Sequence, residues 1–471
     1  MTKGKLGSGG VALFTLCAVI GLDTLTAVAS IGVCAVGWLL LTLVLFVIPY
    51  GKITSELSTT YPGQGGIYEW VHRAFGPRWA ARTSWLYWIN VGLWMPAVYI
   101  LFAGILTELF APELSLHWQV AICIVLTWLT VWICNLSVNI GLWVTKVCAS
   151  LKMMVIFTLG IGGFCYAYHN GMANELSLNT ILPSASNVSA FLPTLVFNVL
   201  GFELVATLSN EMKDVRELPR AVFLAIGITV ALYLFSTLGI LMALPEGDVG
   251  LLSGVIDTLR VLFGDLPSGT VIVKIVGGLT LLTLVGNMVA WTMGSSRAAA
   301  EASSEGELPK LLGRMSKRYN TPIGANTLTG MVSTVVIITY AVFADSADDL
   351  FWSVFAFSSC IALLPYLMML PAHVRLRQDD PDRERPYRVA GGLWVQKAMV
   401  AQCLLVILLA IVLFIFPELS QFSVDWRYSA PVMVGVIATL VIGEMLVKRP
   451  LSQATGYTEA QSPLGQGGNA I

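Results

Sequence analysis

Two apolar stretches of the chain each carry a glycine and an acid near the centre. Residues 11–30 read VALFTLCAVIGLDTLTAVAS, and residues 191–210 read FLPTLVFNVLGFELVATLSN. Each is long enough to cross a bilayer, where an ionisable group is expensive unless it has a function. Because glycine weakens a helix by about 1 kcal/mol relative to alanine, Gly21 and Gly201 predict helix breaks that turn bare backbone toward a cavity. The two glycines are 180 residues apart (201 − 21), which suggests a duplicated architecture.

The composition places the whole chain in a membrane. Of 471 residues, 56% are hydrophobic and 12% are charged, with a mean hydropathy of +0.77, whereas about 25% of residues are charged in soluble domains. The net charge of −1 gives no basic excess for a nucleic-acid partner. The eight cysteines form no C-x-x-C pair, so we expect neither a disulfide framework nor a metal site.

The hydropathy pattern predicts an all-α membrane protein with twelve transmembrane helices. At about 20 apolar residues per crossing, the spans begin near residues 11, 37, 84, 118, 143, 188, 220, 270, 324, 350, 396 and 429. If both termini are cytoplasmic, only Arg260, Lys274 and Arg427 of the 27 lysines and arginines lie outside, which leaves 24 on the inner side. The positive-inside rule therefore predicts cytoplasmic termini.

Three segments outside the spans have distinct patterns. Residues 61–76 contain a glycine-rich turn followed by an amphipathic stretch, Ile67-Tyr68-Glu69-Trp70-Val71, which predicts a surface helix. Residues 301–319 pair acids and bases around apolar residues and predict a second surface helix. The tail, residues 449–471, is rich in Gly, Ser and Gln, and we expect it to be disordered.

Several motifs, in this order and spacing, resemble those of one transporter superfamily. They are Gly65-Gly66-Ile67-Tyr68-Glu69-Trp70, Phe75-Gly76-Pro77-Arg78-Trp79, Gly201-Phe202-Glu203, Asn210-Glu211-Met212-Lys213, Leu218-Pro219-Arg220-Ala221, Trp291 with Gly294-Ser295-Ser296-Arg297, Thr321-Pro322 and Arg385-Pro386-Tyr387-Arg388-Val389. Together they cover most of residues 10–450. The chain resembles the amino acid, polyamine and organocation (APC) superfamily, and within it the bacterial glutamate/GABA antiporter branch.

The resemblance implies a LeuT-like 5+5 inverted repeat with broken helices 1 and 6. The segments would be a cytoplasmic N-terminus (1–10), two five-helix repeats (11–170 and 188–374), helices 11 and 12 (396–448) and the cytoplasmic tail (449–471). Substrate would bind at the midplane, where the first helix of each repeat is broken. A multi-pass protein of the bacterial inner membrane is therefore expected, with the lipid bilayer and a small amine or amino acid as partners and no cofactor.

The first break supplies the predicted substrate ligands Gly21, Leu22, Asp23 and Thr24. A half-helix presents free N–H groups at its N-terminal end and free carbonyls at its C-terminal end, each equivalent to about half an elementary charge. Asp23 is a natural partner for a protonated amine, or alternatively an acid hydrogen-bonded to the unwound backbone. A carboxylate here disfavours an anionic substrate, which is a departure from glutamate transport.

The second break supplies Gly201, Phe202 and Glu203. The resemblance implies that Glu203 stabilises the broken sixth helix or takes part in proton coupling, with direct substrate contact as the alternative. Lys152 is the second proton-coupling candidate, because some members of the superfamily use a fifth-helix lysine in place of sodium. The alternative is a lysine that snorkels to the cytoplasmic surface.

Aromatic and amide side chains near the breaks complete the predicted site. Phe197 and Trp291 would close over a bound amine, with cation–π contact, and Trp94 is a further candidate. Asn198 and Asn287 would hydrogen-bond substrate or, equally, bond helices to one another. At the inner helix ends, Lys52, Glu56 and Arg297 would form a cytoplasmic gate or ordinary surface ion pairs.

Taken together, the pattern predicts a secondary active transporter of an amine-bearing substrate. The substrate would be a neutral or cationic amino acid, a biogenic amine or a polyamine, moved by exchange or proton-coupled alternating access. The alternative is a transceptor, a sensor that keeps the fold and the site without net transport. An enzyme is disfavoured, because the chain contains no H-E-x-x-H, G-x-S-x-G or P-loop motif, and no catalytic residue is predicted. The oligomeric state is left open.

Overall fold

The computed structural model describes residues 7–183, 188–250, 253–343, 347–419 and 423–447, and every regular element in these ranges is a helix. Ten helical stretches of this described part are long and apolar enough to cross a bilayer, and Ser8–Val19 and Ile323–Thr339 are shorter apolar helices. The predicted disordered tail and the first six residues of the predicted N-terminal segment lie outside the described residues.

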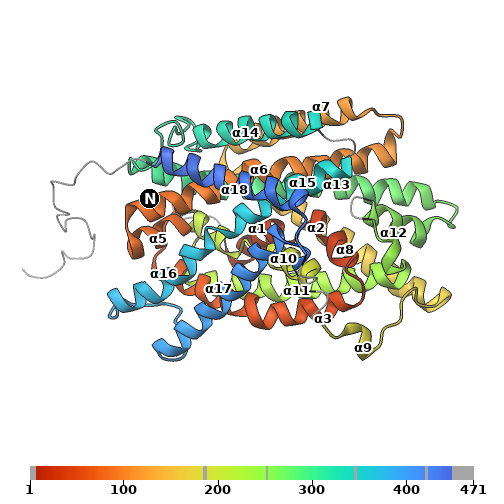
Figure 1. Cartoon of the computed structure of the whole chain (residues 1–471), viewed down its shortest axis with the longest axis horizontal. Helices are drawn as coiled ribbons and strands as arrows, with labels where there is room; N and C mark the ends of the chain where they lie inside the picture. The colour runs from red at the N-terminus through yellow and green to blue at the C-terminus, as the bar shows by residue number, and fades with distance from the viewer. Residues whose placement is uncertain (1–6, 184–187, 251–252, 344–346, 420–422, 448–471) are drawn as a thin grey trace, which may run out of the picture.

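The helices follow the predicted order of spans (Figure 1). Their bounds are α1 Ser8–Val19, α2 Leu22–Ala29, α3 Cys34–Thr42, η1 Leu43–Val47, α4 Ile48–Thr60, α5 Ile67–Phe75, α6 Pro77–Phe110, α7 Leu116–Asn135, α8 Val138–Asn170, α9 Leu178–Ile181, α10 Val188–Asn198, η3 Phe202–Glu211, η4 Val215–Glu217, α11 Leu218–Ala243, η5 Glu246–Asp248, α12 Gly254–Phe263, α13 Gly269–Ser304, α14 Ile323–Phe343, α15 Ala347–Leu363, α16 Tyr366–Asp379, α17 Leu393–Ile415 and α18 Trp426–Leu446. Helices α7 and α14 pack together along one edge of the molecule, while α1, α2 and α10 lie toward its middle (Figure 1).

The first predicted helix break is present at Ile20 and Gly21. Helix α1 ends at Val19 and α2 begins at Leu22, and both intervening residues have extended backbone angles (φ −76°, ψ 106° and φ −92°, ψ 120°). The last carbonyls of α1 and the first N–H groups of α2 are thereby left without their helical partners. This break places four backbone groups of each kind in the protein centre, where other side chains must satisfy them.

The second predicted break is present at Gly201. Helix α10 ends at Asn198, and the chain resumes as a 3₁₀ helix, η3. Between them Gly201 has φ 109°, ψ −1°, a left-handed backbone conformation that residues other than glycine rarely adopt. A Cβ at this position would also lie 2.9 Å from Cζ2 of Trp291. Glycine is therefore required here both by backbone angle and by the close approach of an indole ring.

Substituting Gly201 with alanine should lower the thermal stability of the purified protein. Both the left-handed backbone and the contact with Trp291 oppose the new methyl group, and we expect a loss of about 1–3 kcal/mol. The matched control is Gly227→Ala in α11, where a Cβ meets no atom within 4 Å and should be neutral or slightly stabilising. Equal melting temperatures for the two variants, measured in detergent by intrinsic fluorescence, would contradict this account of the break.

One of the two predicted surface helices is confirmed and the other is wrong. Helix α5 covers the amphipathic stretch that begins at Ile67 and buries Trp70 and Val71. By contrast, α13 extends to Ser304, and the residues that follow form turns up to 322 rather than a helix. Gly306 has φ 81°, which interrupts the helix, and the apolar Leu308 and Leu312 are fully buried. The apolar residues there anchor a turn to the core and do not mark a helix face.

Candidate functional site

A small closed cavity lies between the two helix breaks. Seven of its lining residues were candidates from the sequence, namely Gly21, Thr24, Trp94, Phe197, Asn198, Asn287 and Trp291. The lining residues that were not predicted include three with polar groups, Tyr87, Asn90 and Tyr366. Its open volume is about 20 Å³, which is room for about one water molecule. A cavity of this volume is too small for an amino acid or a diamine.

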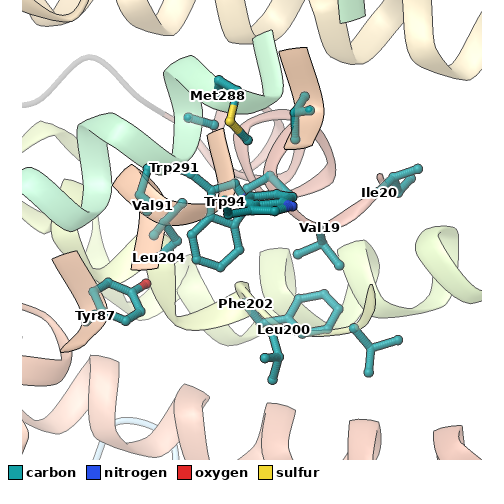
Figure 2. Packing of buried hydrophobic residues seen from close by; sticks show 14 of the residues in the cluster. Val19, Ile20, Tyr87, Val91, Trp94, Leu200, Phe202, Leu204, Met288 and Trp291 are labelled. Carbon is teal, nitrogen blue, oxygen red and sulfur yellow. The ribbon is translucent and has the colours of Figure 1, made fainter. Parts of the chain in front are cut away.

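Three aromatic rings from three helices close the cavity. Trp94 of α6 meets Trp291 of α13 edge to face at 5.7 Å between ring centroids, and meets Phe197 of α10 at 5.5 Å in the same manner. Figure 2 shows the two indoles side by side next to Val19. The Trp94 ring is thus nearly perpendicular to each of the other two rings. Faces of such rings can attract an ammonium or guanidinium ion, and the structure brings the three predicted aromatic residues together, a group called the aromatic cage below.

Glu203 lies behind the cavity wall and is held by three tyrosines. Its carboxylate accepts hydrogen bonds from Tyr87 (2.7 Å), Tyr366 (2.8 Å) and Tyr50. The acid is only 1% exposed and is not among the cavity-lining residues. Tyr50 in turn accepts a bond from the N–H of Gly201 (3.3 Å), so the acid is tied to the second break.

The tyrosines join four elements at this point. Tyr50 comes from α4, Tyr87 from α6 and Tyr366 from the first turn of α16, and all three converge on η3. Two of them, Tyr87 and Tyr366, also line the cavity. A ligand that moves either hydroxyl therefore acts on Glu203 through one hydrogen bond. The sequence reasoning missed these tyrosines, although a tyrosine buried in a membrane span needs a polar partner.

Lys152 of α8 is buried at the end of α1. Its side chain is 1% exposed, and its ammonium donates to the carbonyl oxygens of Cys17 (2.9 Å) and Ile20. The alternative that this lysine snorkels to the cytoplasmic surface is therefore wrong. The cation instead satisfies the free carbonyls that the first break creates, at the negative end of the α1 dipole.

Trp291 and Asn287 bind the same end of α1. The indole Nε1 of Trp291 donates to the carbonyl of Ala18 (2.9 Å). With its amide nitrogen turned toward α1, Asn287 donates to Ala18 O (3.1 Å) and Cys17 O (2.6 Å). Both residues line the cavity, but their polar groups bond helix α13 to α1. Of the two roles predicted for Asn287, the bond between helices is the one that these contacts favour.

The opposite side of the first break is bonded to α11 and α10. Gly21 N donates to the hydroxyl of Tyr233 (2.9 Å), and the Thr24 hydroxyl donates to Gly21 O (3.2 Å). Asn198 Nδ2 donates to Thr24 O (3.3 Å) and so connects the two broken helices. Three other predicted residues at the breaks, Leu22, Gly201 and Phe202, are buried and do not line the cavity.

The backbone of Asp23 lies in the first turn of α2. Its side chain lies outside the described residues, so its predicted role as the amine partner stays a prediction.

The helix ends that were predicted to face the cytoplasm carry three ion pairs, each with at least one buried side chain. Glu56 is bound by Arg377 (Nε to Oε1, 2.7 Å), by Arg385 (3.3 Å) and by the backbone N–H of Val389 (2.7 Å). Arg297 pairs with Glu211 at 3.5 Å and donates to Thr207 O at 2.7 Å. Glu56 and Arg297 were predicted gate residues, but their partners were not identified. Because Glu56, Arg297 and Arg377 are 9% exposed or less, the alternative of surface pairs is wrong for them.

Outside the spans, His72 of α5 contacts Glu307 after α13 at 3.2 Å. The hydrogen bond to Glu307 raises the pKa of His72 above its usual 6.5; partial burial opposes this change, while the charges of Glu307, Glu69 and Glu305 add to it. In its protonated form the imidazole ties α5 to the segment that follows α13.

The stability that His72 contributes should depend on pH. A raised pKa in the folded state means that this contribution is complete below about pH 6.5 and is lost as the pH rises through the raised value. When the buffer is changed from slightly acidic to alkaline, the melting temperature of the wild type should therefore decrease by more than that of His72→Gln does. The exposed His117 supplies the control, because His117→Gln should keep the wild-type dependence. Parallel curves for wild type and His72→Gln would contradict this contribution.

Comparison with known proteins confirms the resemblance to the APC superfamily. The model of the amino acid permease family matches residues 6–438. The Lactococcus lactis protein named "Probable agmatine/putrescine antiporter AguD" is 33% identical over 95% of this chain and 96% of its own length. The glutamate/gamma-aminobutyrate antiporter of the same organism is 21% identical over 86% of this chain and 82% of its length.

A solved structure shares the fold. MhsT in complex with L-phenylalanine superposes with a TM-score of 0.60 at 14% identity, over 88% of this chain and 99% of MhsT. At this identity the likeness concerns the fold alone, which is LeuT-like. The match to the family model extends over 433 residues (438 − 6 + 1) of the 471, and the chain belongs to the amino acid permease family of the APC superfamily.

Proposed function

We propose that this protein is a secondary active transporter that moves an amine-bearing substrate across the bacterial inner membrane by alternating access. Ten long spans, the broken α1–α2 span and the α14 span make up twelve crossings, with both termini cytoplasmic and two inverted five-helix repeats. The substrate is a neutral or cationic amino acid, a biogenic amine or a polyamine. Movement is by exchange or by proton coupling.

The observation that carries this proposal is the chemistry of the cavity between the breaks. Its described lining holds tryptophan, phenylalanine and tyrosine rings and three asparagines, and contains no lysine or arginine. The acid Glu203 lies behind the cavity and accepts a hydrogen bond from each of two lining residues, Tyr87 and Tyr366. Rings and a carboxylate favour a cation, and a carboxylate-rich substrate finds no basic partner there. The relative AguD, named for agmatine and putrescine, supports a cationic amine.

The two buried ionisable groups have separate roles in the proposed cycle. Glu203 couples the cavity to the second break through its tyrosines, so a substrate that displaces Tyr87 or Tyr366 changes the support of η3. Lys152 holds the end of α1, at the place where the superfamily resemblance implies a cation in place of sodium. Loss or gain of a proton at either group would change which helices are bonded together, which is what proton coupling requires.

A ligand screen tests the proposed substrate class. The melting temperature of the purified protein is measured with amino acids, biogenic amines and polyamines, for the wild type and for Asp23→Asn. Cationic amines should raise the wild-type melting temperature by an amount that grows with the logarithm of their concentration above Kd, and Asp23→Asn should need at least a tenfold higher concentration for the same shift. Stabilisation by dicarboxylic amino acids alone would contradict the proposal. An equal response of Asp23→Asn would remove Asp23 from the site and leave the substrate class standing.

A further inference from the structure

Three buried polar atoms at the cavity have no hydrogen-bond partner among the described residues. They are Oδ1 of Asn90, Oδ1 of Asn198 and Nε1 of Trp94, and all three residues line the cavity. Asn90 and Asn198 are 3% and 4% exposed. Buried polar atoms are nearly always satisfied in native proteins, so unpaired ones at a cavity point to a missing ligand.

Helix α6 presents Asn90 to the same space as two residues already placed at the site. Tyr87, Asn90 and Trp94 are spaced by three and four residues, which puts them on one face of a helix. Tyr87 bonds Glu203 and Trp94 contacts Trp291, so Asn90 lies between the acid's tyrosine and the aromatic cage. A serine or threonine in this position would satisfy itself by bonding a carbonyl one turn back, whereas an amide oxygen needs a donor from elsewhere.

Asn198 offers its oxygen from the other side in a fixed orientation. Its Nδ2 donates to Thr24 O at 3.3 Å, which identifies the nitrogen end of the amide and leaves Oδ1 free. Of these three buried unpaired atoms, two are acceptors, on α6 and α10, and one is a donor, the Trp94 indole. A ligand that brings more donors than acceptors fits this balance, as an ammonium or guanidinium group does. A carboxylate, which only accepts, would face both amide oxygens.

We infer that Asn90 is a specificity-determining residue, whose carboxamide oxygen, together with that of Asn198, accepts N–H groups from a second nitrogen-bearing end of the substrate. The inference rests on the proposed transport of amines and narrows it. A substrate with nitrogen at both ends pairs these oxygens, whereas one with an apolar end leaves them buried and unpaired. The site therefore discriminates against the analogue that lacks the second amine, because an unpaired buried group is penalised more than a missing apolar contact.

The test compares two amines that differ by one group, 1,4-diaminobutane and n-pentylamine, in which a methyl replaces one amine. Dissociation constants are measured by calorimetry on the full chain in detergent. The wild type should bind the diamine at least about tenfold more tightly than the monoamine. Asn90→Leu should reduce that ratio at least fivefold by weakening diamine binding, and Asn90→Asp, which keeps the acceptor oxygens, should retain it.

A control separates this effect from general damage. Asn326 of α14 is also buried with an unpaired Oδ1, but it does not line this cavity. Asn326→Leu should therefore keep the wild-type ratio, even if its stability falls as much as that of Asn90→Leu. An unchanged ratio in Asn90→Leu, with amine binding intact, would overturn the inference alone. A wild type that binds neither amine would also overturn the inference, and the proposed function falls with it only if no amino acid, biogenic amine or polyamine of the ligand screen binds either.

Discussion

Replacing Glu203 with leucine is expected to abolish transport and to lower the stability of the protein by several kcal/mol. The carboxylate is the shared acceptor of three buried tyrosine hydroxyls, those of Tyr50, Tyr87 and Tyr366. Hydrogen bonds to charged groups contribute about 1.5–3 kcal/mol each, and removing the common acceptor leaves all three hydroxyl protons without their acceptor in the protein interior. Uptake into proteoliposomes and the melting temperature in detergent measure the two effects.

Two milder substitutions should lower the stability less than Glu203→Leu does, in an order that follows from the hydrogen bonds each one removes. Glu203→Gln keeps one carbonyl oxygen but places an NH₂ group, which cannot accept, against a tyrosine hydroxyl, so its loss of stability should be intermediate. Tyr366→Phe removes a single bond (2.8 Å) and should cost about 1–2 kcal/mol. If Glu203→Leu were as stable as Tyr366→Phe, the acid would not be the common anchor of α4, α6 and α16.

Replacing Lys152 with methionine should have the second-largest effect, with uptake at least about 100-fold below wild type. Methionine matches the length of the lysine stem but supplies no donor, so the carbonyls of Cys17 and Ile20 lose their ammonium partner inside the membrane, where unpaired backbone groups are expensive. The end of α1 should then move toward other donors and distort the cavity. Uptake of the amine found in the ligand screen is the measurement.

The lysine six residues earlier on the same helix provides the control. Lys146 is only partly buried, and Lys146→Met should change uptake less than twofold. A second readout tests proton coupling separately from structure. If Lys152 carries the coupled proton, Lys152→Arg should keep the fold while uptake no longer responds to an imposed pH gradient. Wild-type uptake by Lys152→Met would contradict a role at the break altogether.

The two helix breaks could be predicted because their cause is local. A glycine lowers helix stability wherever it occurs, and an acid in an apolar span signals a polar centre, so Gly21 and Gly201 were identified without knowledge of their neighbours. Phe197 lies about one turn before the second break, whereas Trp291 belongs to another helix, α13, and could be predicted only from its place among the superfamily motifs. The structure adds the left-handed angle at Gly201 and the contact with Trp291 that makes glycine necessary.

The partners of the buried charges could not be predicted because they come from distant segments. Tyr50, Tyr87 and Tyr366 look like ordinary aromatic residues of apolar spans, and only the packing of α4, α6 and α16 brings them to Glu203. The depth of Lys152 in its span left both a buried and a snorkelling position open. The break in α1 decides between them, because it supplies carbonyl acceptors that an intact helix would not offer.

Asn90 could not be identified as a site residue from the sequence. It is one asparagine among several polar residues in membrane spans, and the sequence alone gives no reason to prefer it over Asn326. The structure separates them by location, since Asn90 lines the cavity and Asn326 does not. Which polar residues contact a ligand is thus decided by helix packing, whereas which helices break is decided by the local sequence.

Counterflow in proteoliposomes tests the central claim, that this protein carries an amine across the membrane at the site between the breaks. Vesicles with the purified protein are loaded with unlabelled 1,4-diaminobutane or left empty, and uptake of the labelled diamine is followed. The account predicts faster, transiently concentrating uptake into loaded vesicles with wild type and none with Glu203→Leu. Ligand-induced stabilisation of the wild type without uptake in loaded or empty vesicles would contradict transport and indicate a sensor.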